Sequence, residues 1–195
     1  LATRGTEVIE RHLDIVRAVR AAVAIPVSVK LSPYFSSVGN VALRVVDAGA
    51  DGLVLFNRFL QPDVDLDTFS VSTTFALSTP DEGRLPRTWI AALRKHTPAS
   101  LAGSTGVETS DDVVKYLLAG ADVVMTTASL LRHGPSHATA LIDGVEEWLR
   151  RKDITLADAR GALAVPSEVS VNDYERAGYR AALEKAQETY GTLTV

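Results

Sequence analysis

Apolar residues along the chain follow two alternating patterns. They recur at helical spacing, with charged residues between them, over 7–23, 38–48, 85–95, 109–119 and 136–152. Between these stretches lie short, nearly continuous apolar runs at 25–31, 52–55, 101–102 and 122–125. Continuous apolar strands are typical of a parallel sheet covered by helices. The pattern therefore predicts helices alternating with strands that begin near residues 25, 52, 100 and 122. In the helix over 136–152, we expect Ile142, Val145 and Leu149 to face inward.

An internal repeat supports this alternation. The segment VDAGADGLVL at 46–55 matches LLAGADVVM at 117–125. In each copy a helix ends at a glycine, the usual residue after a helix C-terminus, and a buried strand begins two residues later. Four parallel strands joined by right-handed helical crossovers form half of an eight-stranded barrel. The sequence thus predicts an α/β fold, present as about four βα units of a (β/α)8 TIM barrel.

Two further segments stand apart from the alternating units. Residues 58–87 form a long insertion rich in Pro, Asp, Ser and Thr, and a weak alternation within 65–77 predicts a small hairpin. Residues after 153 contain two more helical patterns. We expect residues 1–152 to form the half-barrel and residues 153–195 to form a helical C-terminal extension.

Two turns of small residues are the strongest functional signal. Gly103–Gly106 follows the third predicted strand, and Thr126–Ser129 follows the fourth. The carboxyl ends of neighbouring parallel strands lie at one edge of a sheet, where backbone N–H groups can bind an anion. Many barrels hold a phosphate after strands 7 and 8. We therefore expect a phosphorylated cofactor here, although either turn alone could serve only tight geometry.

Two polar side chains end other predicted strands. Lys30 closes the first, where its ammonium would face the barrel mouth and need an anionic partner. The alternative is a lysine that reaches solvent or pairs with a carboxylate. Asn57 closes the second strand and offers donors and an acceptor to a planar ligand, or it merely caps the turn.

Composition narrows the classes of function. The 195 residues are 46% hydrophobic and carry a net charge of −4, which argues against nucleic acid as the main partner. No apolar run approaches the roughly 20 residues needed to span a membrane. The absence of cysteine excludes disulfides and a thiolate nucleophile and is compatible with a cytoplasmic location.

The remaining candidates are weaker. The four histidines show no metal-ligand spacing, and we expect no metal; we interpret His133 and His137 as surface residues. Arg84 and Arg87 in the insertion could close over an anionic substrate, although solvated arginines are the commoner case.

Four strands leave two open sheet edges. Unpaired backbone at the edge of an apolar sheet favours association. Either the chain pairs with a second copy, or an N-terminal half-barrel covers the edges. The start at Leu1, without Met and directly before a helix, favours the second interpretation.

Several motifs in order resemble one family. These are IPVSVKLSP at 25–33, GADG at 49–52 with Asn57, FNRF and QPD within 56–63, LSTP at 77–80, and Gly106-Val107 followed by AGADVV at 119–124. Together they resemble the C-terminal half of dihydroorotate dehydrogenases, most of all a dihydroorotate dehydrogenase-like branch. The similarity covers about residues 7–148.

The resemblance implies an FMN-dependent barrel that oxidises dihydroorotate to orotate in pyrimidine biosynthesis. It implies that Asn57 binds substrate and that FMN is held by Lys30, Ser78, Thr79, Thr105, Gly106, Thr127 and Ala128. Lys30 would contact the flavin ring, and backbone N–H groups of the two turns would hold the phosphate. The family's catalytic base, a Cys or Ser, lies in a loop expected upstream of Leu1, so this chain alone is expected to be inactive.

The chain also departs from the pattern of the family it resembles. The family's usual Gly-Gly in the first turn is Thr105-Gly106 here, its Gly-Thr in the second is Thr127-Ala128, and Ser78-Thr79 replaces a common Ser-Gly. Two alternatives to a flavin oxidoreductase therefore stay open. One is a non-redox phosphate-binding lyase or isomerase, in which Lys30 could form a Schiff base. The other is a non-catalytic half-barrel that serves assembly.

Overall fold

The computed structural model describes residues 3–59, 62–72, 76–169, 176–181 and 183–185. The chain divides into two compact units, Leu1–Ala164 and Val165–Val195. The predicted boundary at 152/153 stays a prediction. The helices are α1 (Gly5–Ala22), α2 (Val38–Asp47), η1 (Pro80–Gly83, a 3-10 helix), α3 (Arg84–Leu93), α4 (Ser110–Ala119), α5 (Ala128–His133), α6 (His137–Lys152) and α7 (Leu156–Ala159). The strands are β1 (Ser28–Leu31), β2 (Gly52–Leu55), β3 (Asp63–Asp65), β4 (Ser70–Ser72), β5 (Ser100–Ser104) and β6 (Val123–Met125).

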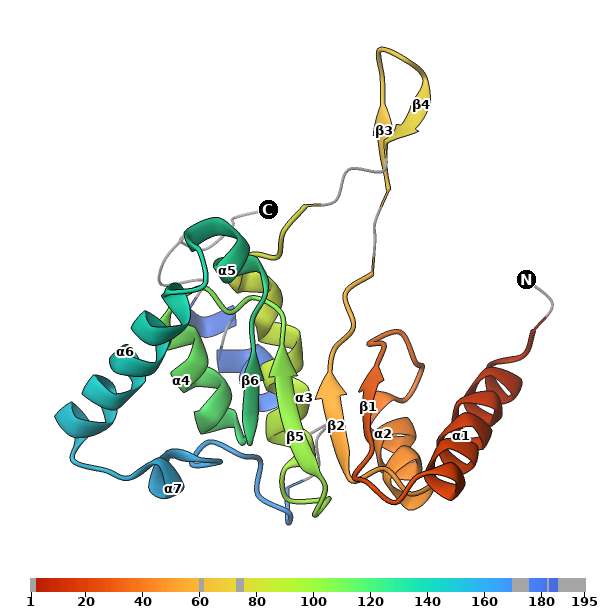
Figure 1. Ribbon diagram of the computed structural model, residues 1–195, viewed down its shortest axis with the longest axis horizontal. Coiled ribbons are helices and arrows are strands. Elements are labelled where there is room, and N and C mark those ends of the chain that lie inside the picture. Colours follow the sequence, from red (N-terminus) through yellow and green to blue (C-terminus); the bar gives the residue numbers. More distant parts are fainter. Residues whose placement is uncertain (1–2, 60–61, 73–75, 170–175, 182, 186–195) are drawn as a thin grey trace. The chain divides into compact units, whose positions relative to one another are not determined.

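The centre of the first unit is a four-stranded parallel sheet in the order β1-β2-β5-β6 (Figure 1). Its register aligns Lys30, Val54, Ala102 and Val123 across the four strands. Each strand is followed by a helix, so the predicted alternation and all four predicted strands are confirmed. β5 and β6 are neighbours, and the two small-residue turns therefore leave the sheet side by side. The first turn is shorter than predicted, because Gly103 and Ser104 belong to β5 and pair within the sheet.

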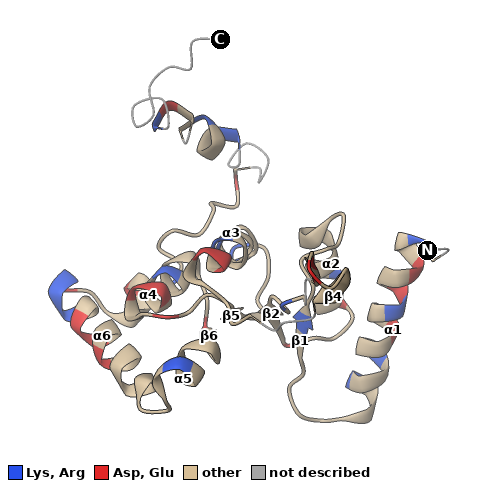
Figure 2. Ribbon diagram, turned by 90° about the horizontal axis from the view of Figure 1, so that it is seen from above, with Lys and Arg blue, Asp and Glu red and all other residues tan. Residues whose placement is uncertain are grey.

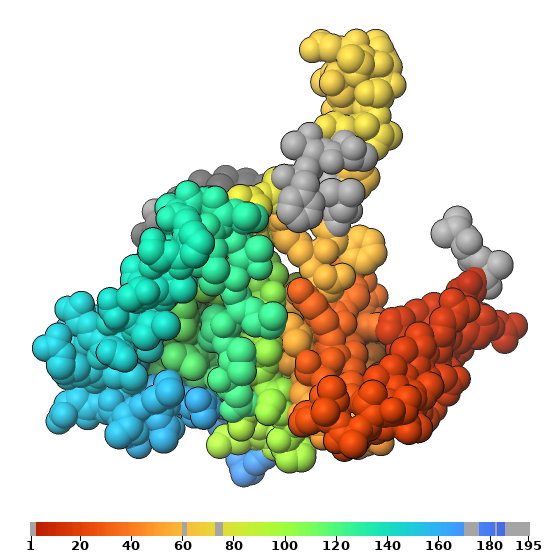
Figure 3. All heavy atoms as spheres, in the orientation of Figure 1, coloured from red at the N-terminus to blue at the C-terminus, as the bar shows by residue number. Residues whose placement is uncertain are grey.

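One face of the sheet is covered by α2, α3 and α4 (Figures 1 and 2). The leucines that point to this face are fully buried: Leu53, Leu55 and Leu101 each have 0% exposure. Tyr116 of α4 lies against Gly103, where even a Cβ would clash at 2.2 Å. This layer is the hydrophobic core. In Figure 3, α1 (red) lies beyond one edge of the sheet, and α5 and α6 (green to blue) lie beyond the other.

The opposite face is exposed at both edge strands. Ser28 and Lys30 of β1 are exposed, as are Val123 and Met125 of β6. The expected continuous apolar strand over 25–31 is wrong in this respect, since β1 begins at Ser28 and Ile25 is 69% exposed. The reason is position: β1 is an edge strand that helices cover on one face only.

Two local predictions need correction. The segment Thr126–Ser129 is not only a turn, because α5 begins at Ala128. In α6, Leu141 is buried while Ile142 is 59% exposed, so Leu141 rather than Ile142 faces inward, together with the partly buried Val145 and Leu149 that the sequence predicts there. Both errors concern a short helix and its neighbour, whose packing the hydrophobic spacing alone does not determine.

The insertion contains the predicted hairpin, with β3 and β4 antiparallel and residues 66–69 as the turn. The hairpin prediction extended over residues 73–75, which lie outside the described residues. After Ala164, the described part of the extension has helical residues at 176–181 and 183–185. Among the helices described, none combines the length and the apolar character that crossing a membrane requires. Acidic and basic residues both occur along α1 (Figure 2).

Candidate functional site

A pocket of about 410 Å³ opens where the strands end, and we call it the rim pocket. All the predicted binding residues except Thr79 line it. Its full lining is Lys30, Asn57, Arg58, Leu77, Ser78, Ser104, Thr105, Gly106, Val107, Met125, Thr126, Thr127, Ala128 and Leu131. The two turns and the two strand-end side chains, which the sequence singled out separately, thus border one space.

The first turn has an unusual backbone. Thr105 has φ +85° and Gly106 has φ +69°, so both adopt the left-handed region. Gly106 also packs closely on Gly83, since an added Cβ would lie 2.6 Å from the Gly83 nitrogen. The Gly106 N–H donates to Ser78 Oγ at 3.4 Å, which places a donor of this turn on the pocket side. At Thr105 the backbone adopts a conformation in which glycine carries no steric penalty.

The second turn is held by hydroxyl groups. Thr126 Oγ1 donates to the carbonyl of Val107 at 2.9 Å and lies 2.8 Å from the buried Ser129 hydroxyl. Thr127 is the residue before α5, and Ala128 is its first residue. These bonds connect the second turn to the residue directly after the first, so the two turns form one structural unit.

Lys30 and Asn57 reach the same pocket from β1 and from the end of β2. Lys30 occupies the third position of β1, on the face that helices do not cover. The backbone N–H of Asn57 donates to the carbonyl of Leu31 at 2.7 Å, which continues the pairing of β1 with β2 by one more bond. This bond fixes the backbone position of Asn57, whose side chain is exposed. An ammonium and a carboxamide therefore border the same space as the amide-rich turns.

Arg58 was not predicted from the sequence, although it directly follows Asn57. Its Nε donates to Glu82 Oε1 at 2.9 Å, and its Nη1 donates to the carbonyl of Ala76. Glu82 also accepts from the Thr79 N–H at 2.6 Å. Burial alone would raise the pKa of Glu82, but the bonds from Thr79 and Arg58 outweigh burial and lower it. Thr79 therefore caps η1 rather than lining the rim pocket, and its predicted role in cofactor binding stays a prediction.

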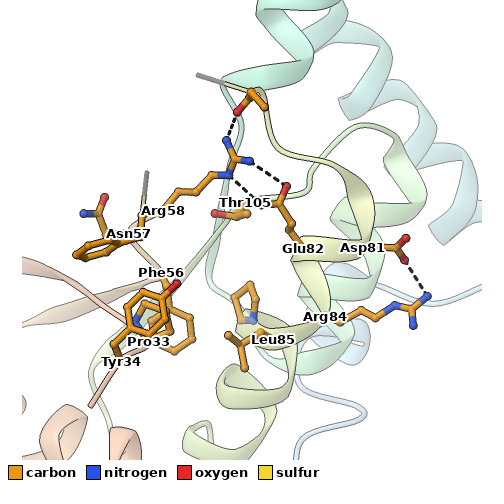
Figure 4. A pocket seen from close by; sticks show the side chains of 13 residues that line it. Pro33, Tyr34, Phe56, Asn57, Arg58, Asp81, Glu82, Arg84, Leu85 and Thr105 are labelled. Atoms are coloured by element: carbon orange, nitrogen blue, oxygen red, sulfur yellow. Dashed lines mark hydrogen bonds and ion pairs between the residues drawn. The ribbon is translucent and has the colours of Figure 1, made fainter. Parts of the chain in front are cut away.

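A second pocket of about 470 Å³ adjoins the first, and we call it the aromatic pocket. Asn57, Arg58 and Thr105 line both. In Figure 4, Pro33, Tyr34 and Phe56 lie together on one side and Leu85 on the other, while Arg58 reaches towards Glu82. The walls are mostly apolar, and the charged residues that line it are paired with one another.

Glu108 anchors a cluster beside the rim pocket. It accepts from His133 at 2.6 Å and forms an ion pair with Arg132, whose Nη2 donates to the Ser78 carbonyl at 2.8 Å. The hydrogen bond from His133 is the largest influence on the pKa of Glu108 and, with Arg132, lowers it against a smaller effect of burial. His137 bonds the Glu108 carbonyl at 2.9 Å. The cluster holds the end of the insertion at the pocket. Among the described residues, no group of three acidic or histidine side chains could hold a metal.

The two arginines that the sequence placed in the insertion have different outcomes: Arg84 fits the interpretation of a solvated arginine, whereas Arg87 fits neither interpretation. Arg84 is mostly exposed and pairs with Asp81 at 2.8 Å. Arg87 lies on α3, where its guanidinium carbon is 5.5 Å from the centre of the Tyr116 ring. Arg87 is thus neither a solvated loop residue nor a residue that lines either pocket.

Known proteins that the chain resembles show its family. A sequence model described as "Dihydroorotate dehydrogenase" matches residues 5–149. The chain belongs to the dihydroorotate dehydrogenase family. It is similar to the "Dihydroorotate dehydrogenase B (NAD(+)), catalytic subunit" of Endomicrobium trichonymphae, with 31% identity over 148 residues, 72% of this chain and 47% of that protein. The protein of the same description from Cutibacterium acnes is 34% identical, over 80% of this chain and 50% of that protein.

The fold comparison agrees with the sequence comparison. A crystal structure of dihydroorotate dehydrogenase from Eimeria tenella in complex with ferulenol aligns with a TM-score of 0.58 at 23% identity. The alignment covers 71% of this chain and 38% of that one. The chain therefore spans about half, or less, of the relatives it matches, and its fold is part of their α/β barrel. These comparisons lend no support to the non-redox alternative.

Proposed function

We propose that the chain supplies the flavin-binding half of an FMN-dependent oxidoreductase. The substrate in this proposal is dihydroorotate or a related small molecule, and the enzyme acts on a CH–CH group. The observation that carries it is the rim pocket, which joins Lys30, Asn57 and both small-residue turns around about 410 Å³. Membership of the family supports the same assignment. A cytoplasmic location and a role in pyrimidine biosynthesis belong to this proposal.

The residues present fit an FMN phosphate. The hydrogen bond from the Gly106 N–H to Ser78 Oγ is long, at 3.4 Å, and a phosphate oxygen could replace its acceptor. The small side chain of Ala128 lets a ligand approach the backbone closely, while the absence of a side chain at Gly106 makes room for Gly83. The proposal places the phosphate at Thr105-Gly106 and Thr127-Ala128, with Ser78 beside it.

Lys30 and Asn57 face the part of the pocket away from the phosphate in this arrangement. When bound, FMN would accept the hydride that the substrate loses. Lys30 would stabilise negative charge on the ring through its ammonium, and Asn57 would orient the substrate through its carboxamide. The titratable side chains that line the rim pocket, Lys30 and Arg58, are both cations. In this proposal, the base that receives the proton of the substrate is therefore a residue that does not line the rim pocket.

The edge strands β1 and β6 leave apolar residues exposed, which supports the proposal that another part of the protein or a second chain packs there. Val123 is 53% exposed and Met125 is 43% exposed on β6, and Ile25 next to β1 is 69% exposed. We infer that an N-terminal half-barrel, or else a second copy of this chain, covers these edges. Sedimentation of the chain separates the two, because a monomer at high concentration would contradict pairing between copies.

FMN binding tests the functional proposal. We expect the chain to bind FMN saturably but weakly, measured by quenching of flavin fluorescence, and not to oxidise dihydroorotate by itself. Lys30→Met should weaken FMN and riboflavin alike, because Lys30 is assigned to the ring. Exposed Lys95→Met serves as the matched control and should leave both affinities unchanged. A chain that binds neither flavin at millimolar concentration would overturn the proposal.

A further inference from the structure

Two side chains that do not line the rim pocket, Tyr116 of α4 and Arg87 of α3, lie next to the first turn. Tyr116 of α4 has 0% exposure, and its hydroxyl lies 3.0 Å from the Ser104 carbonyl oxygen and 2.7 Å from that of Thr105. Burial raises the pKa of Tyr116, so its hydroxyl stays protonated and donates at any ordinary pH. Both carbonyls of the turn are therefore held by one hydroxyl group.

The bond to Tyr116 determines where the amides of the turn point. In a trans peptide group the C=O and the N–H of the next residue point in opposite directions. The carbonyls of Ser104 and Thr105 point to Tyr116, so the N–H groups of Thr105 and Gly106 point away from it. The Gly106 N–H indeed reaches Ser78 Oγ in the rim pocket. Two successive N–H groups on one side form a concave site for an anion.

This arrangement holds Thr105 in a conformation that a side chain disfavours. The φ angle of +85° costs a non-glycine residue about 1–2 kcal/mol relative to its ordinary regions. Such a conformation persists only where surrounding contacts impose it. The hydroxyl of Tyr116 is a contact of this kind, because it bonds the carbonyls on both sides of the Thr105 α-carbon.

Arg87 adds a positive charge at the same place. Within the described part of the chain, its Nη1 is buried without a hydrogen-bond partner. A Cβ on Gly83 would lie 2.7 Å from this Nη1 and 3.3 Å from the Thr105 carbonyl oxygen, so the two groups border one point. An apolar side chain would fill this space without leaving a donor unsatisfied. The guanidinium instead favours a carbonyl dipole that points towards it.

We propose that Tyr116 and Arg87 are positioning residues that aim the amides of the Thr105-Gly106 turn into the rim pocket and thereby select a flavin that carries a terminal phosphate. Neither side chain lines the pocket. They act through the orientation of two peptide groups. This inference rests on the proposed function, because it assigns the phosphate to that turn.

The test compares FMN with riboflavin, which has the same ring and lacks the phosphate. The full chain is titrated with each flavin, and the ratio of the two dissociation constants is the readout. Tyr116→Phe removes only the hydroxyl, and we expect it to weaken FMN by about tenfold while riboflavin changes by less than about twofold. Arg87→Met keeps the length of the side chain and should weaken FMN by about threefold. Matched controls are Tyr179→Phe and Arg17→Met, both at exposed positions that line neither pocket.

The outcomes separate this inference from the proposed function. A wild-type preference for FMN that falls in both variants and survives in both controls supports the inference. A preference that survives Tyr116→Phe overturns it while leaving the proposed function intact. A wild-type chain with no preference for FMN overturns the phosphate site and the inference together. Circular dichroism of each variant checks the fold, and a variant that loses the preference only by unfolding counts against the inference.

Discussion

The two copies of the Ala-Gly-Ala-Asp segment, at 48–51 and 119–122, solve the same structural problem at the amino-terminal ends of β2 and β6. In each copy the glycine has a left-handed backbone, with φ +113° at Gly49 and φ +118° at Gly120. Each glycine also packs on an arginine at the C-terminal end of an earlier helix: Arg20 in the last turn of α1, and Arg94 directly after α3. An added Cβ would lie 3.0 Å from Arg20 Cγ in the first copy and 2.7 Å from Arg94 Cγ in the second.

The aspartates of the two copies match as well. Asp51 accepts from the Val27 N–H at 2.8 Å, and Asp122 accepts from the Leu101 N–H at 2.9 Å. Each also pairs with the arginine of the earlier helix, at 3.2 Å for Asp51 and 2.6 Å for Asp122. One aspartate thus joins a strand, a helix and a turn in both copies.

The copies differ in burial and in the segments that come after their strands. The side chain of Asp51 is 43% exposed, whereas that of Asp122 is 22% exposed and has Arg160 at 3.8 Å as a second cation. At the carboxyl ends of the strands the likeness ends, because Asn57 and the insertion follow β2 while a turn and α5 follow β6. The amino-terminal ends of β2 and β6, where the sequence repeats, therefore serve the structure. Their carboxyl ends, where the two copies diverge, carry the residues of the candidate site.

The largest expected effect is at Asp122. Asp122→Ala removes the acceptor of the Leu101 N–H and the carboxylate that Arg94 pairs with, in a partly buried position, and we expect a loss of about 3 kcal/mol in the free energy of unfolding. Asp51→Ala should cost about 1 kcal/mol, because solvent can replace the more exposed carboxylate. Urea unfolding of both variants measures the difference. Equal losses would show that burial does not distinguish the copies.

The glycines give the next effect. Gly120→Ala forces a Cβ into a left-handed residue and against Arg94, and we expect a loss of about 2 kcal/mol. Gly49→Ala has the same backbone cost but a looser contact, and should lose about 1 kcal/mol. Thermal unfolding ranks the two. If Gly49→Ala proves the more harmful, the crowding at Gly120 is relieved by movement of the Arg94 side chain.

The repeat also shows how much of the fold could be predicted. Helices and strands were placed correctly where burial has a regular spacing, as at β2 and α4. The exposure of β1 was missed because it depends on the number of neighbouring strands, which no local pattern contains. The start of α5 at Ala128 was missed because Thr126–Ser129 has the composition of a turn.

The site divides in the same way. Lys30, Asn57 and the two turns were found because they end predicted strands, and strand ends meet at one edge of a parallel sheet. Arg58 follows Asn57 and could have been included on position alone. Tyr116 gave no such signal, and Arg87 was a candidate only as a loop residue over the substrate, because both occupy helices and reach the turn only through packing. Sequence reasoning therefore found the residues that border the pocket but missed those that support it.

A smaller difference between the copies concerns pH. The helix of the second copy, α4, begins after its N-cap Thr109, and Asp112 in its first turn accepts from the N–H groups of Glu108 and Thr109. By contrast, α2 has no acidic residue in its first turn. Burial alone would raise the pKa of Asp112, but the bonds from Thr109 and Glu108 outweigh burial and lower it from 3.8. A lowered pKa gives stability that is present above pH 3.8 and is lost as the pH falls through the folded-state value.

Asp112→Asn tests this difference. The variant should lose about 1 kcal/mol at pH 7 and show a weaker fall in stability below pH 4 than the wild type. Urea unfolding at pH 7 and at several values below pH 4 measures both. An unchanged acid dependence would place the acid-sensitive carboxylate elsewhere, with Glu108 as the next candidate because its pKa is also lowered.

The smallest expected effect lies at the divergent end, in the turn after β5. Thr105→Gly removes the backbone strain of a threonine held at φ +85°. Glycine also stabilises the unfolded chain through its larger conformational entropy, and we expect the removed strain to exceed this effect by about 0.5 kcal/mol. The variant should therefore unfold at a slightly higher urea concentration, the opposite direction from both glycine substitutions in the repeats. Gly106→Ala is the matched comparison in the same turn, and it should destabilise because its Cβ would lie 2.6 Å from the Gly83 nitrogen. A destabilised Thr105→Gly would mean that the threonine side chain stabilises the turn by more than its backbone strain costs.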